Sequence, residues 1–151
     1  MCLCLSAKKS DEFGQTIDFD KLYEKVIHPA ICDAQMNAIR EDEENAGGII
    51  HKSMFEKLML CDFAIADLTT ANPNVLYELG IRHGIRPHST VLLGVDATRF
   101  PFDVRPLRAL SYGLDKLGNL SNPSETKQAL TDRLRAPRKI GSLGRFSAMD
   151  S

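Results

Sequence analysis

Residues 61–84 read CDFAIADLTTANPNVLYELGIRHG and decide the fold. The first part, CDFAIADL, is a short apolar run of the kind expected for a strand that is covered on both faces. Asn72 is a favourable helix N-cap and Pro73 suits the first helical position, so a helix is predicted over residues 73–84. A second apolar run, TVLLGV at residues 90–95, predicts another buried strand. This order indicates two parallel strands joined by a helical crossover.

Within the predicted helix, Val75, Leu79 and His83 recur at helical spacing, with Leu76 beside them. This stripe is expected to face the sheet. His83 is therefore predicted to be a core histidine with a structural role rather than a catalytic one.

The alternation of strands and helices continues on both sides of this segment. The spacing of apolar residues over 17–34 predicts a helix with Asp18 as its N-cap and a bend at Pro29. We therefore expect an α/β chain, a flavodoxin-like three-layer sandwich whose mostly parallel sheet has four or five strands, with residues 61–68 central. Further strands are expected at residues 1–5, 36–40 and 107–114, and further helices at residues 49–60 and 124–134.

The composition is that of one globular domain. Of the 151 residues, 43% are hydrophobic and 26% are charged, so the chain can bury a core without cross-links. Residues 1–137 are expected to form the α/β domain, and residues 138–151, rich in Gly, Ser and Arg, a linker or flexible tail. The formal net charge of -1 gives no global attraction to nucleic acid, which is therefore not an expected partner.

The cysteines and the longest apolar runs bear on metal binding and location. Cys2, Cys4, Cys32 and Cys61 do not have the spacing of zinc ligands, so no metal site is predicted, and we expect buried thiols in a reducing compartment. No apolar run reaches the roughly 18 residues that a membrane span needs. A cytoplasmic location without membrane contact is expected.

The candidate site lies where the 61–68 strand ends, because sheets of this kind bind ligands at the carboxyl ends of their strands. Asp67 stands at that end, and Glu78 lies on the flank of the following helix, near its start, where the helix dipole favours a carboxylate. Together with the amides of Asn72 and Asn74, the two carboxylates can hold ribose hydroxyls. A carboxylate below the anomeric carbon can attack it or stabilise its oxocarbenium-like charge.

Structural roles for these residues stay open. Glu78 could form an i,i+4 ion pair with Arg82, and Asp67 could simply shape the turn, as could Asn72. The end of the strand at residues 36–40 and the loop that follows carry Arg40 and Asp42 at the same edge of the sheet. These side chains could contact substrate, although a solvated charged loop is the commoner explanation.

Residues 61–84 resemble the ADLT-x-x-NPNV-x-YELG motif of bacterial nucleoside 2-deoxyribosyltransferase-like and TIR-like domains. A closer similarity is to the bacterial domain found ahead of tetratricopeptide repeats. That domain is related to the TRAF-binding region of certain mitogen-activated kinase kinase kinases. The resemblance extends to TIDFDKLYEKVIHPAI and IREDEENAGGIIHKSMFEKL upstream and to STVLL and PFDVRPLRAL downstream, so it covers roughly residues 1–136.

The resemblance implies roles for individual residues. Glu78 falls where the superfamily has its catalytic glutamate. Asp67, Asn72 and Asn74 fall in the sugar-facing loop. Ser6 falls where such folds approach the nucleotide.

The resemblance also implies a reaction, the cleavage of an N-glycosidic bond in a nucleotide. NAD is the foremost substrate, for an NADase-type hydrolase, and base release or transfer from a nucleoside is the related reaction. The nucleotide is the substrate, and no separate cofactor is implied. The alternative is a non-catalytic nucleotide-sensing or protein-interaction module in signalling or defence. A C-terminal repeat domain or a second copy of the chain are the implied partners.

Overall fold

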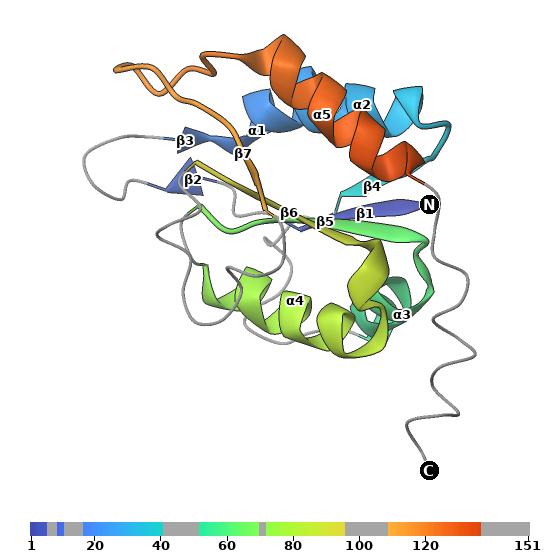
Figure 1. Cartoon of the computed structure of the whole chain (residues 1–151). Helices are drawn as coiled ribbons and strands as arrows, with labels where there is room; N and C mark the ends of the chain where they lie inside the picture. The colour runs from blue at the N-terminus through green and yellow to red at the C-terminus, as the bar shows by residue number, and fades with distance from the viewer. Residues whose placement is uncertain (6–8, 11–16, 41–51, 70–71, 96–108, 137–151) are drawn as a thin grey trace.

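The computed structural model describes the chain except for residues 6–8, 11–16, 41–51, 70–71, 96–108 and 137–151. The predictions for Ser6, for Asp42 and for the tail at residues 138–151 lie outside the described residues. A central sheet is covered by helices on both faces (Figure 1). This arrangement confirms the predicted three-layer α/β sandwich.

The central sheet has five strands, which are β1 (Cys2–Leu5), β4 (Ala38–Arg40), β5 (Phe63–Asp67), β6 (Thr90–Gly94) and β7 (Leu110–Ser111). Their spatial order is β4-β1-β5-β6-β7, and every neighbouring pair is parallel. Counted along the chain, this order is 2-1-3-4-5, which is flavodoxin-like. The apolar run that contains β5 predicts a central strand, and β5 is central with all of its residues buried.

A small antiparallel sheet follows β1 and was not predicted. It pairs β2 (Lys9–Ser10) with β3 (Ile17–Asp18). Strands of two residues are too short to show a hydrophobic alternation, so the sequence pattern gave no sign of them.

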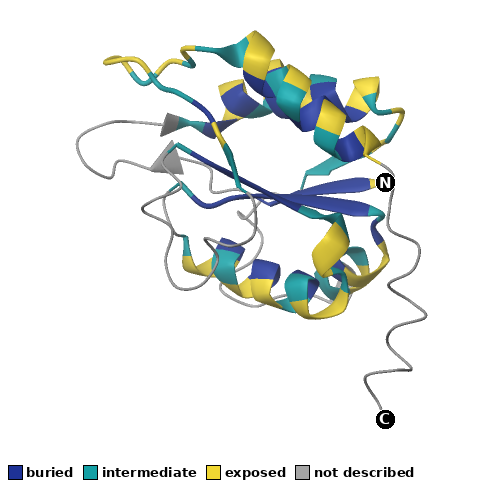
Figure 2. Ribbon diagram, viewed as in Figure 1, coloured by how far each residue is buried: buried dark blue, intermediate teal, exposed yellow. Residues whose placement is uncertain are grey.

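Helices on the two faces of the sheet bury two separate core clusters. One face is covered by α1 (Phe19–Leu22), η2 (Tyr23–Ile27), α2 (His28–Asp33) and α5 (Pro123–Arg135), and the other by α3 (Lys52–Leu60) and α4 (Pro73–Ile85). Strand side chains alternate between the clusters: Cys2 and Cys4 pack with the first set of helices, whereas Leu3 and Leu5 pack with the second. Figure 2 shows the buried strands between the two helical layers. A short turn, η4 (Pro87–Ser89), precedes β6.

The helix predicted over residues 17–34 is present, with a change of geometry in its middle. Asp18 caps it by accepting hydrogen bonds from the N–H groups of Asp20 and Lys21. The turn before Pro29 is a π-helix, in which the His28 N–H donates to the Tyr23 carbonyl. A proline has no N–H to donate and its ring crowds the carbonyl four residues earlier, which favours a widened turn at this point. The predicted cap is confirmed, and near Pro29 the structure shows a change of helix geometry, from the π-helix η2 to α2, within a continuous helical segment.

The prediction for the buried stripe of α4 is wrong by one residue. Val75 and Leu79 are buried as expected, but the third member is Arg82, and His83 is only partly buried. Glu78 also belongs to the buried set. A fully buried arginine is compatible with the core because its N–H groups find acceptors, as described below.

All four cysteines are free thiols, and three of them are buried as expected. Cys32 is exposed on α2, which corrects the prediction for that residue. Burial raises the pKa of Cys2 to about 12 and raises that of Cys61 as well, so these thiols stay protonated and unreactive. Among the described helices the longest, α4 and α5, have 13 residues each, and none could span a bilayer.

Candidate functional site

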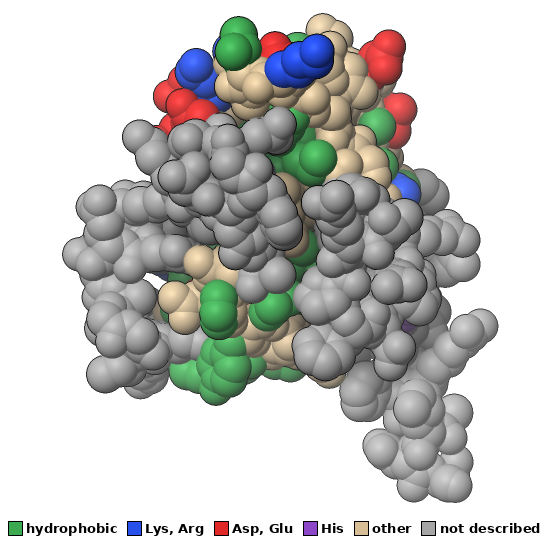
Figure 3. Space-filling view, turned by 90° about the vertical axis from the view of Figure 1, so that its left-hand side faces the viewer, with side chains coloured by type: hydrophobic (Ala, Val, Ile, Leu, Met, Phe, Trp, Pro, Cys, Tyr) green, Lys and Arg blue, Asp and Glu red, His purple; other side chains and the backbone are tan. Residues whose placement is uncertain are grey.

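The carboxyl ends of β1 and β5 form the switch point of the sheet. Along the chain, β1 is followed by helices on one face, whereas β5 is followed by α4 on the other face. Doubly wound sheets bind ligands in the crevice where two such connections leave in opposite directions. Figure 3 views the molecule from this edge, where charged side chains gather toward the layer of α1 and α5 and hydrophobic side chains toward α4.

Asp67 ends β5 at this switch point, and only 3% of its surface is exposed. Its Oδ1 accepts a hydrogen bond of 2.9 Å from the Thr69 N–H, and its Oδ2 accepts one of 2.7 Å from the Tyr112 hydroxyl. The Thr69 hydroxyl lies 2.8 Å from the Tyr112 hydroxyl and accepts a bond of 3.3 Å from the Val95 N–H. We call Asp67, Thr69 and Tyr112 the Asp67 cluster, and it links the carboxyl ends of β5, β6 and β7.

The directions of the hydrogen bonds in the Asp67 cluster follow from the available protons. Tyr112 has one hydroxyl proton, which it donates to Asp67, so the Thr69 hydroxyl donates to the Tyr112 oxygen. Burial raises the pKa of Asp67, and the hydrogen bonds from Tyr112 and Thr69 oppose this effect. Burial and the neighbouring carboxylate raise the pKa of Tyr112, which therefore remains a neutral donor at physiological pH. Both oxygens of Asp67 are thus engaged within the protein.

Asn72 caps α4, as predicted. Its Oδ1 accepts from the N–H groups of Asn74 at 2.9 Å and Val75 at 3.3 Å, so the amide oxygen is used in the cap. Asn74 itself is exposed in the first turn. Asp67 and Asn72 therefore make the turn-shaping contacts that the sequence left open as an alternative to sugar binding.

Glu78 lies in the second turn of α4, with 9% of its surface exposed. An i,i+4 ion pair with Glu78 does not explain why Arg82 is buried. All five N–H groups of its guanidinium donate to other acceptors. Its acceptors are the carbonyls of Leu58, Cys61 and Asp62, the carbonyl and hydroxyl of Ser89, and the hydroxyl of Thr90. These acceptors lie toward the amino ends of β5 and β6, at the opposite edge of the sheet from Asp67.

The two carboxylates predicted to share the site come from different layers. Asp67 alternates along β5 with Ala66, so its side chain shares a face with Ile65 and joins Tyr112 on the side of α5. Glu78 belongs to α4, which covers the other face. Asp67 ends β5 at the switch point, and the structure brings it together with Thr69 and Tyr112 rather than with Asn72 or Asn74.

Arg40, the remaining predicted contact, has structural partners in the described part of the chain. Its guanidinium forms a 2.6 Å salt bridge with Asp20 and lies 4.8 Å from the centroid of the Tyr23 ring. These contacts tie β4 to α1 and η2. The other two predicted contacts, Ser6 and Asp42, belong to residues that the structure does not describe.

Thr69 and Tyr112 were not identified as site residues from the sequence. Thr69 follows the strand directly, so the ADLT segment does hold a signal for it: a carboxylate two residues earlier commonly bonds such an N–H. Tyr112 is 45 residues from Asp67 and reaches it only because β7 lies two strands away in the same sheet. No local pattern contains that information.

Comparison with protein-family models, with curated proteins and with solved structures found no match for this chain. Within the described residues, no group of three or more His, Cys, Asp and Glu side chains is arranged to hold a metal ion. A functional assignment therefore depends on the residues of the chain itself and on the resemblance of its 61–84 motif.

Proposed function

We propose that the chain cleaves the N-glycosidic bond of a nucleotide, with NAD as the foremost substrate, and that Glu78 is its catalytic carboxylate. The observation that best supports this proposal is a buried carboxylate in the second turn of the helix that follows the central strand at the switch point of the sheet. Glutamates are rarely buried in a core without a polar role, and this end of the helix favours negative charge.

In this reaction the bond between C1′ of the ribose and the base nitrogen breaks, and the base leaves with the bonding electrons. From NAD, the cationic pyridinium leaves as neutral nicotinamide while positive charge develops on the sugar. The carboxylate of Glu78 stabilises this charge or bonds to C1′. Water then forms the new bond to C1′ and loses a proton, and where Glu78 had bonded to C1′ that bond breaks and the carboxylate is released; in the transfer reaction a second base takes the place of water.

Asp67 has a positioning role in this scheme. Both of its oxygens accept hydrogen bonds from within the protein, so it does not act as the nucleophile. By holding Thr69 and Tyr112 it fixes the chain that leaves β5 toward α4. Asp67→Asn is therefore expected to slow turnover less than a change at Glu78.

The Glu78→Gln variant tests the proposal. Glutamine keeps the volume and the helix propensity but loses the charge that faces the cationic sugar, so turnover should fall at least about a hundredfold, equivalent to about 3 kcal/mol. The measurement is chromatographic detection of free base from NAD and from deoxynucleosides. Glu56→Gln, an exposed position on α3 in the same helical layer, is the matched control and should keep full activity.

Thermal unfolding of both variants shows whether the fold is kept. Full turnover by Glu78→Gln on a substrate that the wild type cleaves would exclude Glu78 as the catalytic group.

A second candidate function, a nucleotide-sensing module without turnover, is favoured by one observation. Both oxygens of Asp67 are engaged within the protein, so this carboxylate holds the crevice in shape, which a binding site needs even where no bond is cleaved. The wild type would then bind NAD in a calorimeter and release no nicotinamide. In that case Glu78 is a ribose ligand, Glu78→Gln weakens binding, and the signal passes to a C-terminal repeat domain or a second copy of the chain.

A further inference from the structure

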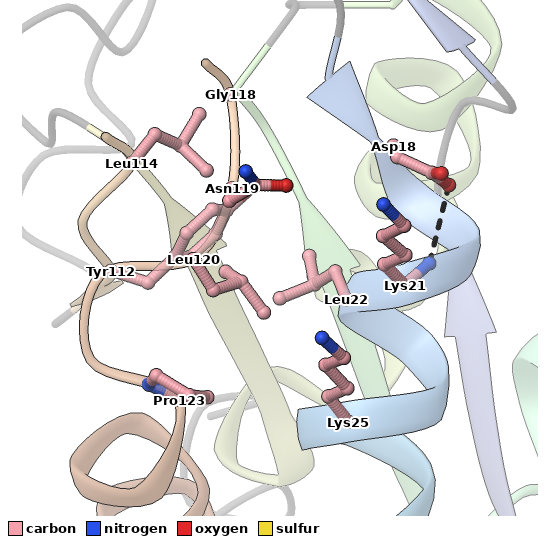
Figure 4. A pocket seen from close by; sticks show the side chains of 10 residues that line it. All are labelled: Asp18, Lys21, Leu22, Lys25, Tyr112, Leu114, Gly118, Asn119, Leu120 and Pro123. Atoms are coloured by element: carbon pink, nitrogen blue, oxygen red, sulfur yellow. Dashed lines mark hydrogen bonds between the residues drawn. The ribbon is translucent and has the colours of Figure 1, made fainter. Parts of the chain in front are cut away.

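A pocket of about 80 Å³ opens at the same edge of the sheet, between α1–η2 and the segment that follows β7. Its apolar wall is formed by Leu22, Tyr112 and Leu120. Lys21 and Lys25 from the helix and Asn119 from the opposite segment supply polar groups. Figure 4 shows the two lysines on one wall and Asn119 facing them. Tyr112 is shared with the Asp67 cluster, since its hydroxyl contacts Asp67.

The wall that carries Asn119 is held in shape by a tight turn. Leu114 and Leu120 pair as an antiparallel bridge. Between them, Asp115 Oδ1 accepts hydrogen bonds of 2.8 Å from the Leu117 N–H and 2.9 Å from the Asn119 N–H. Gly118 supplies the left-handed backbone conformation of the turn, with φ of 81°. The pocket therefore has a pre-formed wall opposite the lysines.

The pocket has an excess of positive charge. Lys21 and Lys25 lie one helical turn apart and are both exposed, and such a like-charged pair is mutually repulsive. Among the described residues, neither ammonium group pairs with a carboxylate. Asp18 also lines the pocket, but its carboxylate caps α1 by accepting from two N–H groups. The lining side chains thus carry two positive charges and one negative charge, and the negative one is held in the helix cap.

We propose that this pocket binds the phosphate group of a small soluble molecule. A phosphate monoester carries a charge of about −1.5 to −2 at pH 7, which matches two lysines better than a monocarboxylate does. Lysine binds phosphate as a point charge, and the Asn119 amide can donate a further hydrogen bond. The pocket is large enough to admit a phosphate group. This site is distinct from the one assigned to Glu78, which belongs to the layer of α4 on the other face of the sheet.

Titration with inorganic phosphate, followed by amide NMR of the full chain at low ionic strength, tests the proposal. Saturable shifts are expected in residues 18–25 and 112–120. Lys21→Gln and Lys25→Gln should each weaken binding about fivefold, and together about twentyfold, because an exposed ion pair contributes up to about 1 kcal/mol. Lys127→Gln is the matched control, since Lys127 lies on α5 and pairs with Asp33 at 3.0 Å; it should leave the affinity unchanged.

Three results would overturn the proposal. Unsaturable shifts spread over all lysine-bearing surfaces would show non-specific attraction. If acetate bound as tightly as phosphate, the pocket would have no preference for a dianion. An unchanged affinity in the Lys21→Gln/Lys25→Gln double variant, with its amide spectrum otherwise intact, would show that phosphate binds elsewhere.

Discussion

The two ends of the sheet each bury a charged side chain, but they hold it in different ways. At the amino ends of the strands, Arg82 is fully buried, and its Nη1 donates at 2.8 Å and 2.7 Å to the backbone carbonyls of Leu58 and Cys61. At the carboxyl ends, Asp67 is equally inaccessible but accepts from a tyrosine hydroxyl and a backbone N–H. Both ends of the sheet bury a charged side chain. The two differ in the groups that form hydrogen bonds with it.

The partners indicate what each charge does. Leu58 and Cys61 lie at the C-terminal end of α3, where the last carbonyls have no intrahelical donor and the dipole favours a cation. Arg82 therefore joins α4 to the end of α3. The Asp67 cluster joins side chains from the ends of β5 and β7, and the Val95 N–H after β6 donates to it, at the edge where this fold class binds ligands. Arg82 joins backbone segments at the amino edge and stabilises the fold, whereas Asp67 lies at the edge where this fold class binds ligands and is a candidate for function.

The largest effect in this comparison is expected from Arg82→Met. Methionine fills much of the space but leaves several buried carbonyls without donors, so the free energy of unfolding should fall by about 3 kcal/mol or more. Burial lowers the pKa of Arg82 to about 10, so the side chain is still charged at neutral pH and its loss is the loss of a cation. Urea denaturation at pH 7 measures the change.

Two companion variants sharpen this measurement. Arg82→Lys keeps the charge but not the five-donor fork, and should show an intermediate loss. Arg86→Met, at the C-cap of the same helix, should change stability by no more than about 0.5 kcal/mol. If Arg82→Met unfolded at the same urea concentration as Arg86→Met, the contacts at the amino edge would not stabilise the fold.

The sheet could be predicted from the sequence because its features are local. The unbroken apolar run at residues 61–68, the Asn72–Pro73 helix start and the next apolar run at residues 90–95 each report on their own neighbourhood. Parallel pairing and the central place of β5 then follow from connection rules.

The polar contacts could not be predicted in the same way. Arg82 sits where a helical pattern expects an apolar side chain, and only its carbonyl acceptors in α3 and before β6 explain its burial. Tyr112 meets Asp67 through strand order, and its own strand is just two residues long. Glu78 was selected from the motif and from its position in the helical repeat. The face of the sheet on which the Asp67 side chain lies depends on the alternation of side chains along β5, which the site prediction did not include.

At the carboxyl edge, Tyr112→Phe should cost about 2 kcal/mol in the free energy of unfolding. The ring stays, so no cavity forms, but Asp67 Oδ2 loses its donor while remaining buried, and the Thr69 hydroxyl loses its acceptor. Tyr77→Phe is the matched control, because Tyr77 is 61% exposed on α4 and its change should be close to neutral. Equal effects of the two variants in urea denaturation would show that the cluster contributes nothing to stability.

Titration of Asp67 is expected to have a smaller effect, which appears as a change of the free energy of unfolding with pH. Its pKa in the folded chain is raised above the ordinary value of 3.8, so the folded state holds the proton more tightly than the unfolded state. The stability of the wild type relative to Asp67→Asn should therefore be greatest below pH 3.8 and fall as the pH rises through the raised pKa, then level off. Urea denaturation of both proteins between about pH 3 and pH 7 measures the difference. A difference that grew with pH would mean that the hydrogen bonds outweigh burial.

The smallest effect is expected at Asn72, where two variants distinguish a helix-capping role from a sugar-binding role. Asn72→Ala should lower the free energy of unfolding by about 1 kcal/mol, because two N–H groups at the start of α4 lose their acceptor. Asn72→Asp keeps the acceptor and adds a charge that the helix dipole favours, so its stability should match or slightly exceed that of the wild type. The aspartate has no amide N–H, however, so it cannot donate a hydrogen bond to a ribose hydroxyl. A stable Asn72→Asp variant with full base release would confine Asn72 to capping, whereas a stable variant with a raised KM for the nucleotide would give it a second role at the carboxyl edge.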